Sequence, residues 1–333
     1  MGLISIIIPF KNTVHFLPEC IDSIRKQRHE NWEVLAVNDK SNDDSNELMY
    51  QYSAQDTRIK VFQNSGTGII PALQTAYGHA KGNFITRMDS DDVMKPQRLS
   101  VMVNALKSHG QGYVSVGQVK YFSDRGISDG YNRYEKWLNE LTSQGTNYSE
   151  IYKECVIPSP CWMVHRQDFE NCRGFTPNRY PEDYDLTFRF YEKGLKVIPC
   201  DEVLHLWRDY DTRTSRTHEH YAQNYFLDIK MHYFLKLDYD TTRPLVVWGA
   251  GFKGKTVAKK LLEKNISFTW LCDNPNKIDK KIYGKEMKHF STMKELEKPQ
   301  SIITVANEQA QVEITNYLRL LGQTQINDFI FFC

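Results

Sequence analysis

The sequence predicts an α/β protein whose first part is built on a mainly parallel sheet, and three observations support this. Residues 3–9 form a continuous apolar, β-branched run that ends at a proline, a pattern typical of a strand buried on both faces. Apolar residues at helical spacing over 16–28 then lead to a second such run at 32–37, which completes a strand–helix–strand unit. The chain has 333 residues, and roughly 150 residues per domain predicts two domains.

Composition limits the function classes. With Lys+Arg 42 against Asp+Glu 41, the net charge is +1, so no global field attracts nucleic acid or an anionic membrane, and we expect no nucleic-acid partner. The 7 cysteines lack C-x-x-C spacing, which argues against a disulfide framework or a structural zinc site and fits a reducing cytoplasm. Because no apolar run approaches the roughly 20 residues that span a bilayer, any membrane association is expected to be peripheral, at the inner face.

Polar groups follow the ends of the predicted strands. Helices are expected at about 45–53 and 70–79, and strands at 59–62 and from 84 toward Asp89. In open α/β sheets, ligands bind beyond the carboxyl ends of the strands, so these loops should converge on one ligand. The residues concerned are Pro9, Phe10, Asn12, Asp39, Asn64, Gly68, Asp89 and Ser90.

Three carboxylates, Asp89, Asp91 and Asp92, end the fourth strand, with only Ser90 between them. Several anions at one strand end repel one another unless a cation lies among them, and hard oxygen ligands suit Mg²⁺ or Mn²⁺. The alternative is an acidic turn that caps the next helix, because a D-x-D tripeptide is common. We expect Asp92 to cap the helix predicted over 96–106.

A series of motifs in order and spacing resembles family 2 glycosyltransferases with the GT-A fold. The series is S-I-I-I-P-F-K-N, A-V-N-D-K-S-N-D-D-S, N-S-G-T-G-I-I-P-A-L-Q-T-A and R-M-D-S-D-D-V-M-K-P-Q-R-L, followed by G-F and P-E-D-Y-D-L-T-F-R at 174–189. The likeness covers about residues 3–220. It implies inverting transfer of a sugar from a nucleotide-diphosphate donor.

The resemblance also assigns roles on the donor side. Asp39 matches the residue that hydrogen-bonds the uracil ring, although Asn38 departs from the usual first Asp of the pair. Asp89 matches the residue near the ribose and metal, and Asp91 matches the principal metal ligand, with Mn²⁺ or Mg²⁺ as the cofactor. Arg87 is either a phosphate or sugar contact or an exposed strand-end arginine.

On the acceptor side, Asp183 matches the acid of the family's E-D motif and is expected to be the general base, with Glu182 as its rival near the acceptor. Trp162 is either a platform for the acceptor or a core tryptophan. Family members often close a loop over the diphosphate and supply a histidine to the metal. That implies His205 or His218 as a metal ligand and Arg208 or Arg216, with Ser215, as diphosphate contacts.

A second domain is expected to begin after a polar linker, which divides the chain into 1–240, the glycosyltransferase domain, and 241–333, a small Rossmann-like domain. Residues 249–254 fit G-x-G-x-x-G between a strand and a helix, and Asp273 ends the next strand. One reading is an NAD(P)-dependent oxidoreductase or nucleotide-sugar-modifying enzyme. The reading we prefer is an accessory or oligomerisation module, as on some glycosyltransferases that resemble β-1,3-N-acetylglucosaminyltransferase-like proteins.

We therefore expect a cytoplasmic glycosyltransferase that moves a sugar from a UDP-sugar to a hydroxyl of a glycan or lipid-linked acceptor in cell-surface polysaccharide synthesis. The resemblance favours UDP-GlcNAc or UDP-Gal as the donor. A non-catalytic binding protein that kept the fold is a third class, but the acidic motif residues are all present. Strands are also predicted at 113–117, 118–122, 162–165, 197–199 and 203–207, with an acceptor-specific stretch at 124–149.

Overall fold

A computed structural model describes residues 2–213, 216 and 225–333, apart from the side chain of Tyr225. The chain forms two compact units, the first comprising Met1–Tyr148 and Val156–Arg216 and the second Ser149–Cys155 and Thr217–Cys333. The second unit therefore includes helix α9 (Tyr225–Tyr233), which the sequence-based division at residue 240 had assigned to the first domain.

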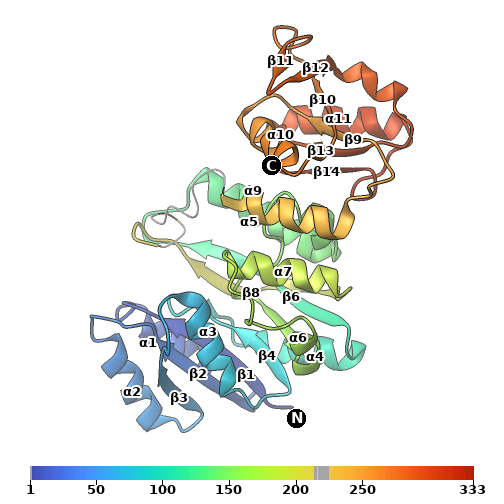
Figure 1. The fold of residues 1–333 in the computed structure, drawn as a ribbon. Helices are drawn as coiled ribbons and strands as arrows, with labels where there is room; N and C mark the ends of the chain where they lie inside the picture. The colour runs from blue at the N-terminus through green and yellow to red at the C-terminus, as the bar shows by residue number, and fades with distance from the viewer. Residues whose placement is uncertain (1, 214–215, 217–224) are drawn as a thin grey trace. The chain divides into compact units, whose positions relative to one another are not determined.

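The first unit contains, within the described residues, a mixed sheet of 8 strands in the order β3-β2-β1-β4-β7-β6-β8-β5 (Figure 1). The amino-terminal part is parallel, because β1 (Ile4–Phe10) pairs with β2 (Trp32–Asn38) and β4 (Phe84–Arg87), and β2 pairs with β3 (Ile59–Gln63). Every residue of β1 and β2 is buried, as their continuous apolar runs predict. The expectation of a mainly parallel α/β sheet is confirmed for this part.

Helices connect these strands and cover the sheet. They are α1 (Leu17–Arg25), α2 (Ser45–Gln55) and α3 (Ile69–Gly78), and α3 lies against β1 and β2. Gly68 is the residue before α3 and has φ +93, a left-handed conformation that favours glycine. This arrangement brings the loops after β1, β2 and β4 to the same edge of the sheet.

The remaining strands make the sheet mixed. β7 (Trp162–His165) runs antiparallel between β4 and β6 (Tyr113–Phe122), while β8 (Lys196–Arg208) is parallel to β6 and antiparallel to β5 (Val93–Met94). The two strands expected at 113–117 and 118–122 are one strand, β6, whose pairing with β8 shifts register around Gly117 and Gln118. The strands expected at 197–199 and 203–207 likewise belong to the single strand β8.

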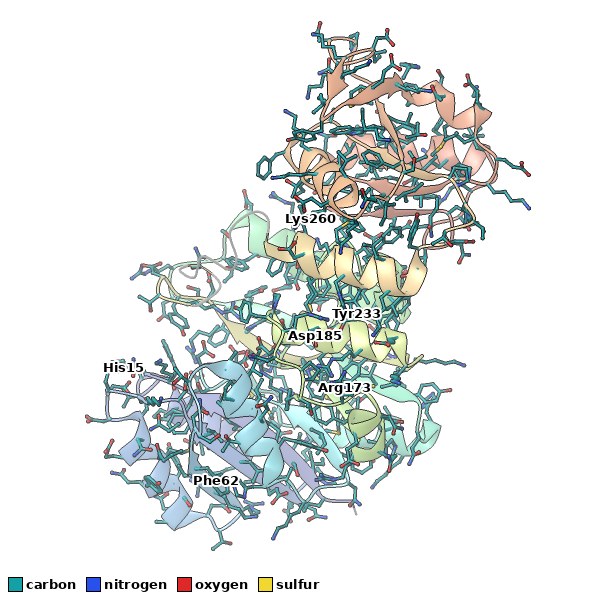
Figure 2. All side chains as sticks on the ribbon, viewed as in Figure 1. His15, Phe62, Arg173, Asp185, Tyr233 and Lys260 are labelled. Atoms are coloured by element: carbon teal, nitrogen blue, oxygen red, sulfur yellow. The ribbon has the colours of Figure 1, made fainter. Side chains whose placement is uncertain are left out.

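Four α-helices accompany the strands of this half within the described residues. They are α4 (Arg98–His109), α5 (Asp129–Gln144), α6 (Arg166–Asn171) and α7 (Glu182–Glu192). On α7, Asp185, labelled in Figure 2, accepts a hydrogen bond from Arg189 Nε at 2.8 Å and is 1% exposed. Arg189 also donates to the carbonyl of Gly174 at 2.7 Å, which ties the start of α7 to the preceding G-F segment.

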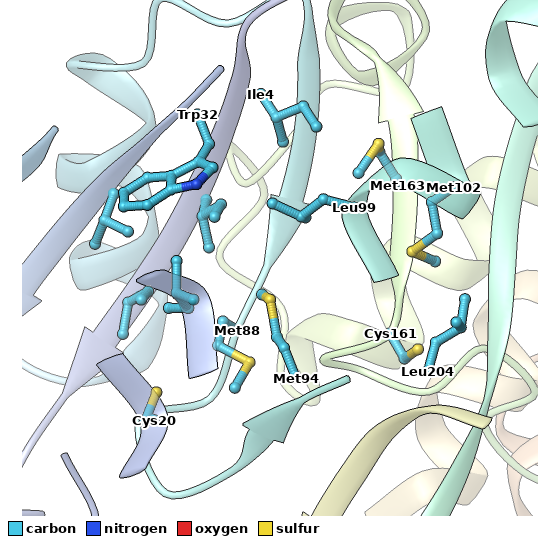
Figure 3. Packing of buried hydrophobic residues seen from close by; sticks show 14 of the residues in the cluster. Ile4, Cys20, Trp32, Met88, Met94, Leu99, Met102, Cys161, Met163 and Leu204 are labelled. Atoms are coloured by element: carbon cyan, nitrogen blue, oxygen red, sulfur yellow. The ribbon is translucent and has the colours of Figure 1, made fainter. Parts of the chain in front are cut away.

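The core of the first unit lies between the sheet and its helices (Figure 3). Its buried side chains come from segments far apart in the sequence, including Ile4, Trp32, Leu99, Met163 and Leu204. Because the core joins the amino-terminal parallel strands to β7 and β8, the strand ends that carry the polar residues rest on a common apolar base.

The second unit is a smaller α/β layer. Within the described residues its sheet order is β11-β12-β10-β9-β13-β14, and the five strands from β12 to β14 are mutually parallel. The strands are β9 (Leu245–Trp248), β10 (Thr269–Cys272), β11 (Lys281–Ile282), β12 (Lys285–His289), β13 (Gln300–Ile303) and β14 (Phe329–Phe331), and the long helices are α10 (Phe252–Glu263) and α11 (Glu308–Leu320). Within the part of the chain that the structure describes, no helix combines the length and apolar character needed to cross a membrane.

Candidate active site

Asp39 follows β2 and lies at the centre of the first group of site residues. Its Oδ1 accepts hydrogen bonds from Asn64 Nδ2 at 2.6 Å and from the Gly68 backbone N–H at 3.0 Å. Asn64 Nδ2 also donates to the Gly68 carbonyl at 3.1 Å. The structure thus brings together three residues that the sequence placed on two separate loops, Asp39, Asn64 and Gly68.

The loop after β1 is tied to the loop after β2. Asp39 N–H donates to the Phe10 carbonyl at 2.9 Å, and Pro9 is paired in register with Val37. Asn12 has φ +53, and its Oδ1 accepts from the Asn42 N–H at 2.9 Å. Phe10 therefore contacts Asp39, and the loop after β1 lies beside the loop after β2, as the convergence of strand ends predicts.

The acidic cluster after β4 is electrostatically crowded. Burial, followed by the charges of Asp92 and Asp89, raises the pKa of Asp91 to about 7. Burial and the charge of Asp89 raise the pKa of Asp92 to about 8. Such shifts indicate negative charges that the surrounding protein groups do not fully neutralise, which is the environment a bound cation would stabilise. Ser90, between the first two carboxylates, is 5% exposed.

Arg87 links this cluster to α7. The guanidinium is buried and lies 2.9 Å from Asp89 Oδ1 through Nη2, while Nη1 donates to Glu182 Oε1 at 2.8 Å. Arg87 is therefore not an exposed strand-end arginine. Instead it joins the end of β4 to the first residue of α7, and it occupies Glu182 in an ion pair.

Asp183 is placed differently from its neighbour Glu182. It is half-buried, and the one hydrogen bond of its carboxylate within the described part of the chain is accepted by Oδ1 from the Tyr184 N–H at 2.7 Å. Burial and the charge of Glu182 raise the pKa of Asp183 to about 7, against the opposing effect of Arg87. A carboxyl group that titrates near neutrality is suited to accept a proton from an alcohol during catalysis.

His205 and Asp92 differ from expectation. His205 is completely buried on β8, with Nδ1 2.9 Å from Arg98 Nη1 and Nε2 2.9 Å from Asp92 Oδ2, so both ring nitrogens are occupied. This placement does not favour the expected role of His205 as a metal ligand. The expectation that Asp92 caps the next helix is wrong, because the residue before α4 is Gln97 and Asp92 instead binds His205 and the Arg208 N–H at 2.8 Å.

The arginines expected at the diphosphate are both engaged with protein acids. Arg208 donates through Nε to the Asp91 carbonyl at 2.7 Å and also pairs with Glu19, while Arg216 makes a two-point ion pair with Asp209 at 2.8 and 2.6 Å. Arg208 therefore lies at the acidic cluster, whereas Arg216 is exposed and held by Asp209. Ser215 and His218 lie outside the described residues.

Trp162 belongs to the core. It is 2% exposed, and its ring stacks on Phe169 with centroids 5.9 Å apart and an interplanar angle of 20°. A ring covered in this way offers no face to a sugar, so the structure supports the core alternative and not the acceptor platform.

Two residues near the acidic cluster were not among the site residues predicted from the sequence. Tyr210 donates its hydroxyl to Asp91 Oδ2 at 2.8 Å, and Arg213 is close enough for its charge to lower the pKa of both Asp91 and Asp92. Both lie in the polar stretch after β8, which reads D-Y-D-T-R-T-S-R, and nothing in that pattern singles them out. A third, Lys11, lies 3.8 Å from Asp39 Oδ2 and was visible only as part of the F-K-N motif.

The carboxylates fit a hard divalent cation by their chemistry. Within the described residues, no group of three or more His, Cys, Asp or Glu side chains converges as a ready-made metal cage. Mg²⁺ sites in nucleotide enzymes commonly use one or two carboxylates together with substrate phosphates, and such a site needs no cage made by protein alone. Asp91, with Asp89 nearby, supplies the oxygens for a site of this kind, where the metal would stabilise negative charge on a leaving phosphate.

The G-x-G-x-x-G stretch joins β9 to α10 in the second unit. Gly249 has φ +126, and a Cβ added at Gly254 would lie 2.1 Å from the Gly249 carbonyl oxygen, so both glycines are needed for the close approach of helix and strand. At Gly251, by contrast, an added Cβ meets nothing within 4 Å. Asp273 is exposed directly after β10. The geometry accounts for two of the three glycines by packing alone.

The match to known families decides the identity. The family model described as Glycosyl transferase family 2 matches residues 5–173, which contain β1 to β4, the acidic cluster and β7. The chain belongs to this family. It is therefore a glycosyltransferase, and the resemblance read from the motifs is confirmed.

Curated relatives cover the same part of the chain. The glycosyltransferase GlyG of Streptococcus pneumoniae is 26% identical over 221 residues, which cover 65% of this chain and 73% of GlyG. A glycosyltransferase of Haemophilus influenzae is 33% identical over 228 residues, which cover 66% of this chain and 69% of the H. influenzae protein. The Escherichia coli enzyme WfgD, named as a UDP-Glc:α-D-GlcNAc-diphosphoundecaprenol β-1,3-glucosyltransferase, is 28% identical over 208 residues, covering 62% of this chain and 77% of WfgD.

Among solved structures, Staphylococcus aureus TarS residues 1–349 in complex with UDP-GlcNAc superimposes with a TM-score of 0.55 at 19% identity, covering 72% of this chain and 68% of that one. At this identity the likeness establishes the fold and no more. The family member described here therefore has the GT-A fold, as its motifs imply.

Proposed function

We propose that this glycosyltransferase transfers a sugar, with inversion, from a UDP-sugar to a hydroxyl of a glycan or lipid-linked acceptor in cell-surface polysaccharide synthesis, with Mn²⁺ or Mg²⁺ as cofactor. The observation that carries the proposal is the pairing made by Arg87. It occupies Glu182 in an ion pair, whereas the carboxylate of Asp183, close to the acidic cluster after β4, accepts one hydrogen bond within the described residues, from a backbone N–H.

The donor nucleotide is assigned to the loops around Asp39. An acceptor oxygen of the Asp39 carboxylate is available to a ring N–H of uracil, and the Asn64–Gly68 contacts hold that carboxylate in place. TarS, which has the same fold, binds UDP-GlcNAc and UDP in its solved structures, and WfgD is named for a UDP-Glc donor. These facts support a UDP-sugar here and leave UDP-GlcNAc and UDP-Gal, favoured by resemblance, as the donors to test first.

The diphosphate is assigned to the acidic cluster. Asp91, with Asp89, is proposed to hold the divalent ion, which would stabilise the departing UDP. Arg208 lies at this cluster already, and Arg213 is near enough to influence the same carboxylates, so one of these arginines is the better candidate for a phosphate contact than Arg216. Tyr210 would have to leave Asp91 for the metal to use both carboxylate oxygens.

Asp183 is proposed as the general base. Inversion requires a carboxylate that removes the proton from the acceptor hydroxyl as that oxygen attacks the anomeric carbon, on the face opposite the leaving diphosphate. Glu182 is paired with Arg87, so it is the positioning member of the E-D pair rather than an acceptor contact.

The relatives support a proposal for the acceptor and the place of action. WfgD is named for a sugar-diphosphoundecaprenol acceptor, and an acceptor of that kind would bring this enzyme to the inner face of the cytoplasmic membrane as a peripheral protein. The second unit is proposed as a Rossmann-like accessory or oligomerisation module, because packing accounts for Gly249 and Gly254. The NAD(P)-dependent alternative rests on Gly251, where space remains beside the backbone.

The test is a screen of UDP-Glc, UDP-Gal, UDP-GlcNAc and UDP-GalNAc for release of UDP, with Mn²⁺ and with EDTA. We expect one donor to be hydrolysed in the presence of Mn²⁺ and none in EDTA. If a transferred product forms, NMR of its anomeric proton should report a configuration opposite to that of the donor. Equal rates in EDTA would contradict the metal assignment, and retained configuration would contradict the role of Asp183.

A further inference from the structure

We propose that His205 is a positioning residue for the metal-binding loop, with its ring oriented by Arg98 and its proton directed at Asp92. The inference rests on the proposed function, in which Asp91 holds the metal. It assigns to Arg98 and Asp92 a task that neither the family match nor the motif pattern gives them.

Arg98 is the buried anchor of this arrangement. It is the first residue of α4 and has no exposed surface, yet its guanidinium reaches two strands. Nη2 donates to Thr86 Oγ1 at 3.1 Å and to the Arg87 carbonyl at 3.0 Å, both on β4, while Nη1 lies 2.9 Å from His205 Nδ1 on β8. A side chain held at three points in this way has little freedom to move.

The chemistry of arginine fixes the tautomer of His205. A guanidinium has N–H donors and no acceptor, so His205 Nδ1 must accept the hydrogen bond from Arg98. In a neutral imidazole the proton is then on Nε2, which donates to Asp92 Oδ2 at 2.9 Å. Burial and the neighbouring charge of Arg98 lower the pKa of His205 well below its usual value, which keeps the ring neutral.

Asp92 connects the fixed ring of His205 to the residues around Asp91. Its second oxygen, Oδ1, accepts from the Arg208 N–H at 2.8 Å, and Arg208 Nε donates to the carbonyl of Asp91 at 2.7 Å. The Asp91 carbonyl and the side chain of the next residue, Asp92, are therefore both held by groups from β8. Asp91 itself remains half-buried, with its carboxylate bound by the Tyr210 hydroxyl.

The arrangement matches the way metal sites are supported by residues that do not touch the ion. Partners that orient a metal ligand typically change metal affinity or activity by about 10–100-fold when they are altered. His205, with both nitrogens used, acts through Asp92 and not as a ligand.

Two substitutions of His205 separate its contacts. In His205→Gln, the side-chain amide reaches the position of Nε2 and can still donate to Asp92. In His205→Asn, the shorter amide reaches only the position of Nδ1, so the contact with Arg98 is kept and the contact with Asp92 is lost. Ser5→Ala is the matched control. It breaks a buried hydrogen bond of 2.8 Å from Ser5 to Glu33 in the same sheet, near the starts of β1 and β2 and therefore at the end of these strands opposite the site.

The measurement is the affinity of UDP by calorimetry, in Mn²⁺ and in EDTA, for each variant. The ratio of the two dissociation constants reports the gain due to the metal. We expect His205→Asn to reduce that gain about tenfold or more, and His205→Gln and Ser5→Ala to retain it within about threefold of the wild type. The affinity in EDTA should stay the same, because a general loss of structure would lower both affinities.

The outcomes are distinct. If wild-type protein shows no gain from Mn²⁺, the metal part of the proposed function fails and this inference fails with it. If the wild type shows the gain and His205→Asn keeps it in full, the inference alone is overturned. Should His205→Asn fail to fold, Thr86→Val provides a second test, since it removes one acceptor of Arg98 together with the hydroxyl's hydrogen bond to the Trp162 carbonyl. It is expected to reduce the gain by a smaller factor with the affinity in EDTA unchanged, and an unchanged gain there would also contradict the inference.

Discussion

Arg87 Nη1 donates to Glu182 Oε1 at 2.8 Å, which links two motifs that are 95 residues apart in the sequence. The same guanidinium pairs with Asp89, so the strand end proposed to bind the metal and the helix that carries the E-D pair share one buried cation. This pairing distinguishes two adjacent acids. Glu182 has a fixed partner, whereas Asp183 has a backbone N–H and a pKa raised to about 7 by burial and the charge of Glu182.

The two acids should therefore respond differently to loss of charge. Asp183→Asn should leave the affinity for UDP and Mn²⁺ nearly unchanged and reduce turnover by roughly 10² or more, the usual range for a lost general base. Glu182→Gln should instead lower the free energy of unfolding by roughly 1–3 kcal/mol, because buried Arg87 keeps a neutral partner in place of a charged one. Turnover with saturating donor and chemical denaturation measure the two effects. Near-normal turnover in Asp183→Asn with loss in Glu182→Gln would exchange the roles.

Turnover should depend on the ionisation of Asp183. With a pKa of about 7 in the folded protein, the carboxylate is the base above neutral pH and is protonated as the pH falls. At saturating donor and Mn²⁺, kcat should reach a plateau on the alkaline side and fall about tenfold per pH unit below neutrality. The small residual kcat of Asp183→Asn should not show this fall below neutral pH. A wild-type profile that is flat between about pH 5.5 and 8.5 would argue against a base with this pKa.

Gly68 should be needed for its backbone conformation. An alanine there meets nothing within 4 Å, so the effect of Gly68→Ala comes from φ +93 alone and should cost roughly 1 kcal/mol. Since the Gly68 N–H donates to Asp39, the affinity for UDP should fall as well. Gly78→Ala, at the other end of α3 and also in open space, is the control and should leave UDP binding unchanged. Calorimetric UDP binding to both variants makes the comparison, and equal effects would remove Gly68 from the donor site.

The convergence of the loops after the first strands could be predicted from the sequence because local patterns determine it. Continuous β-branched runs identify β1 and β2, parallel strands present their carboxyl ends at one edge, and Asp39, Asn64 and Gly68 meet there. These residues are set by the positions of strand ends, which a hydrophobic pattern reveals.

The residues predicted less well depend on contacts between distant segments. Whether Trp162 faces a sugar or the core is decided by Phe169 and Phe190, and the role of His205 is decided by Arg98, 107 residues away. A lone tryptophan or histidine carries no periodic signal that would distinguish these cases. Asp92 was predicted to cap the next helix, but its carboxylate instead accepts a hydrogen bond from His205, a buried residue on β8.

Point substitutions in the second unit should not change the affinity for the donor nucleotide. Gly254→Ala places a Cβ 2.1 Å from the Gly249 carbonyl oxygen, a backbone atom that cannot move aside cheaply, and should lower stability by roughly 1–3 kcal/mol. Gly251→Ala, with open space around it, should be nearly neutral. Hydrogen exchange should localise the effect of Gly254→Ala to β9 and α10, with UDP–Mn²⁺ affinity unchanged in both variants. Loss of UDP binding in folded Gly251→Ala would instead place part of the donor site in the second unit.

The central claim is that the acidic cluster after β4 binds a UDP-sugar through a divalent metal, and UDP binding with and without Mn²⁺ tests it most directly. Titration of UDP into wild-type protein and into Asp91→Asn should show affinity that depends on Mn²⁺ in the wild type and is lost in the variant, because a neutral amide is a poor ligand for a hard cation. Asp22→Asn, which changes an acid on α1 paired only with Arg25 among the described contacts, should behave as the wild type. Tight binding of NAD(H) without binding of UDP, or unchanged UDP–Mn²⁺ affinity in Asp91→Asn, would contradict the claim.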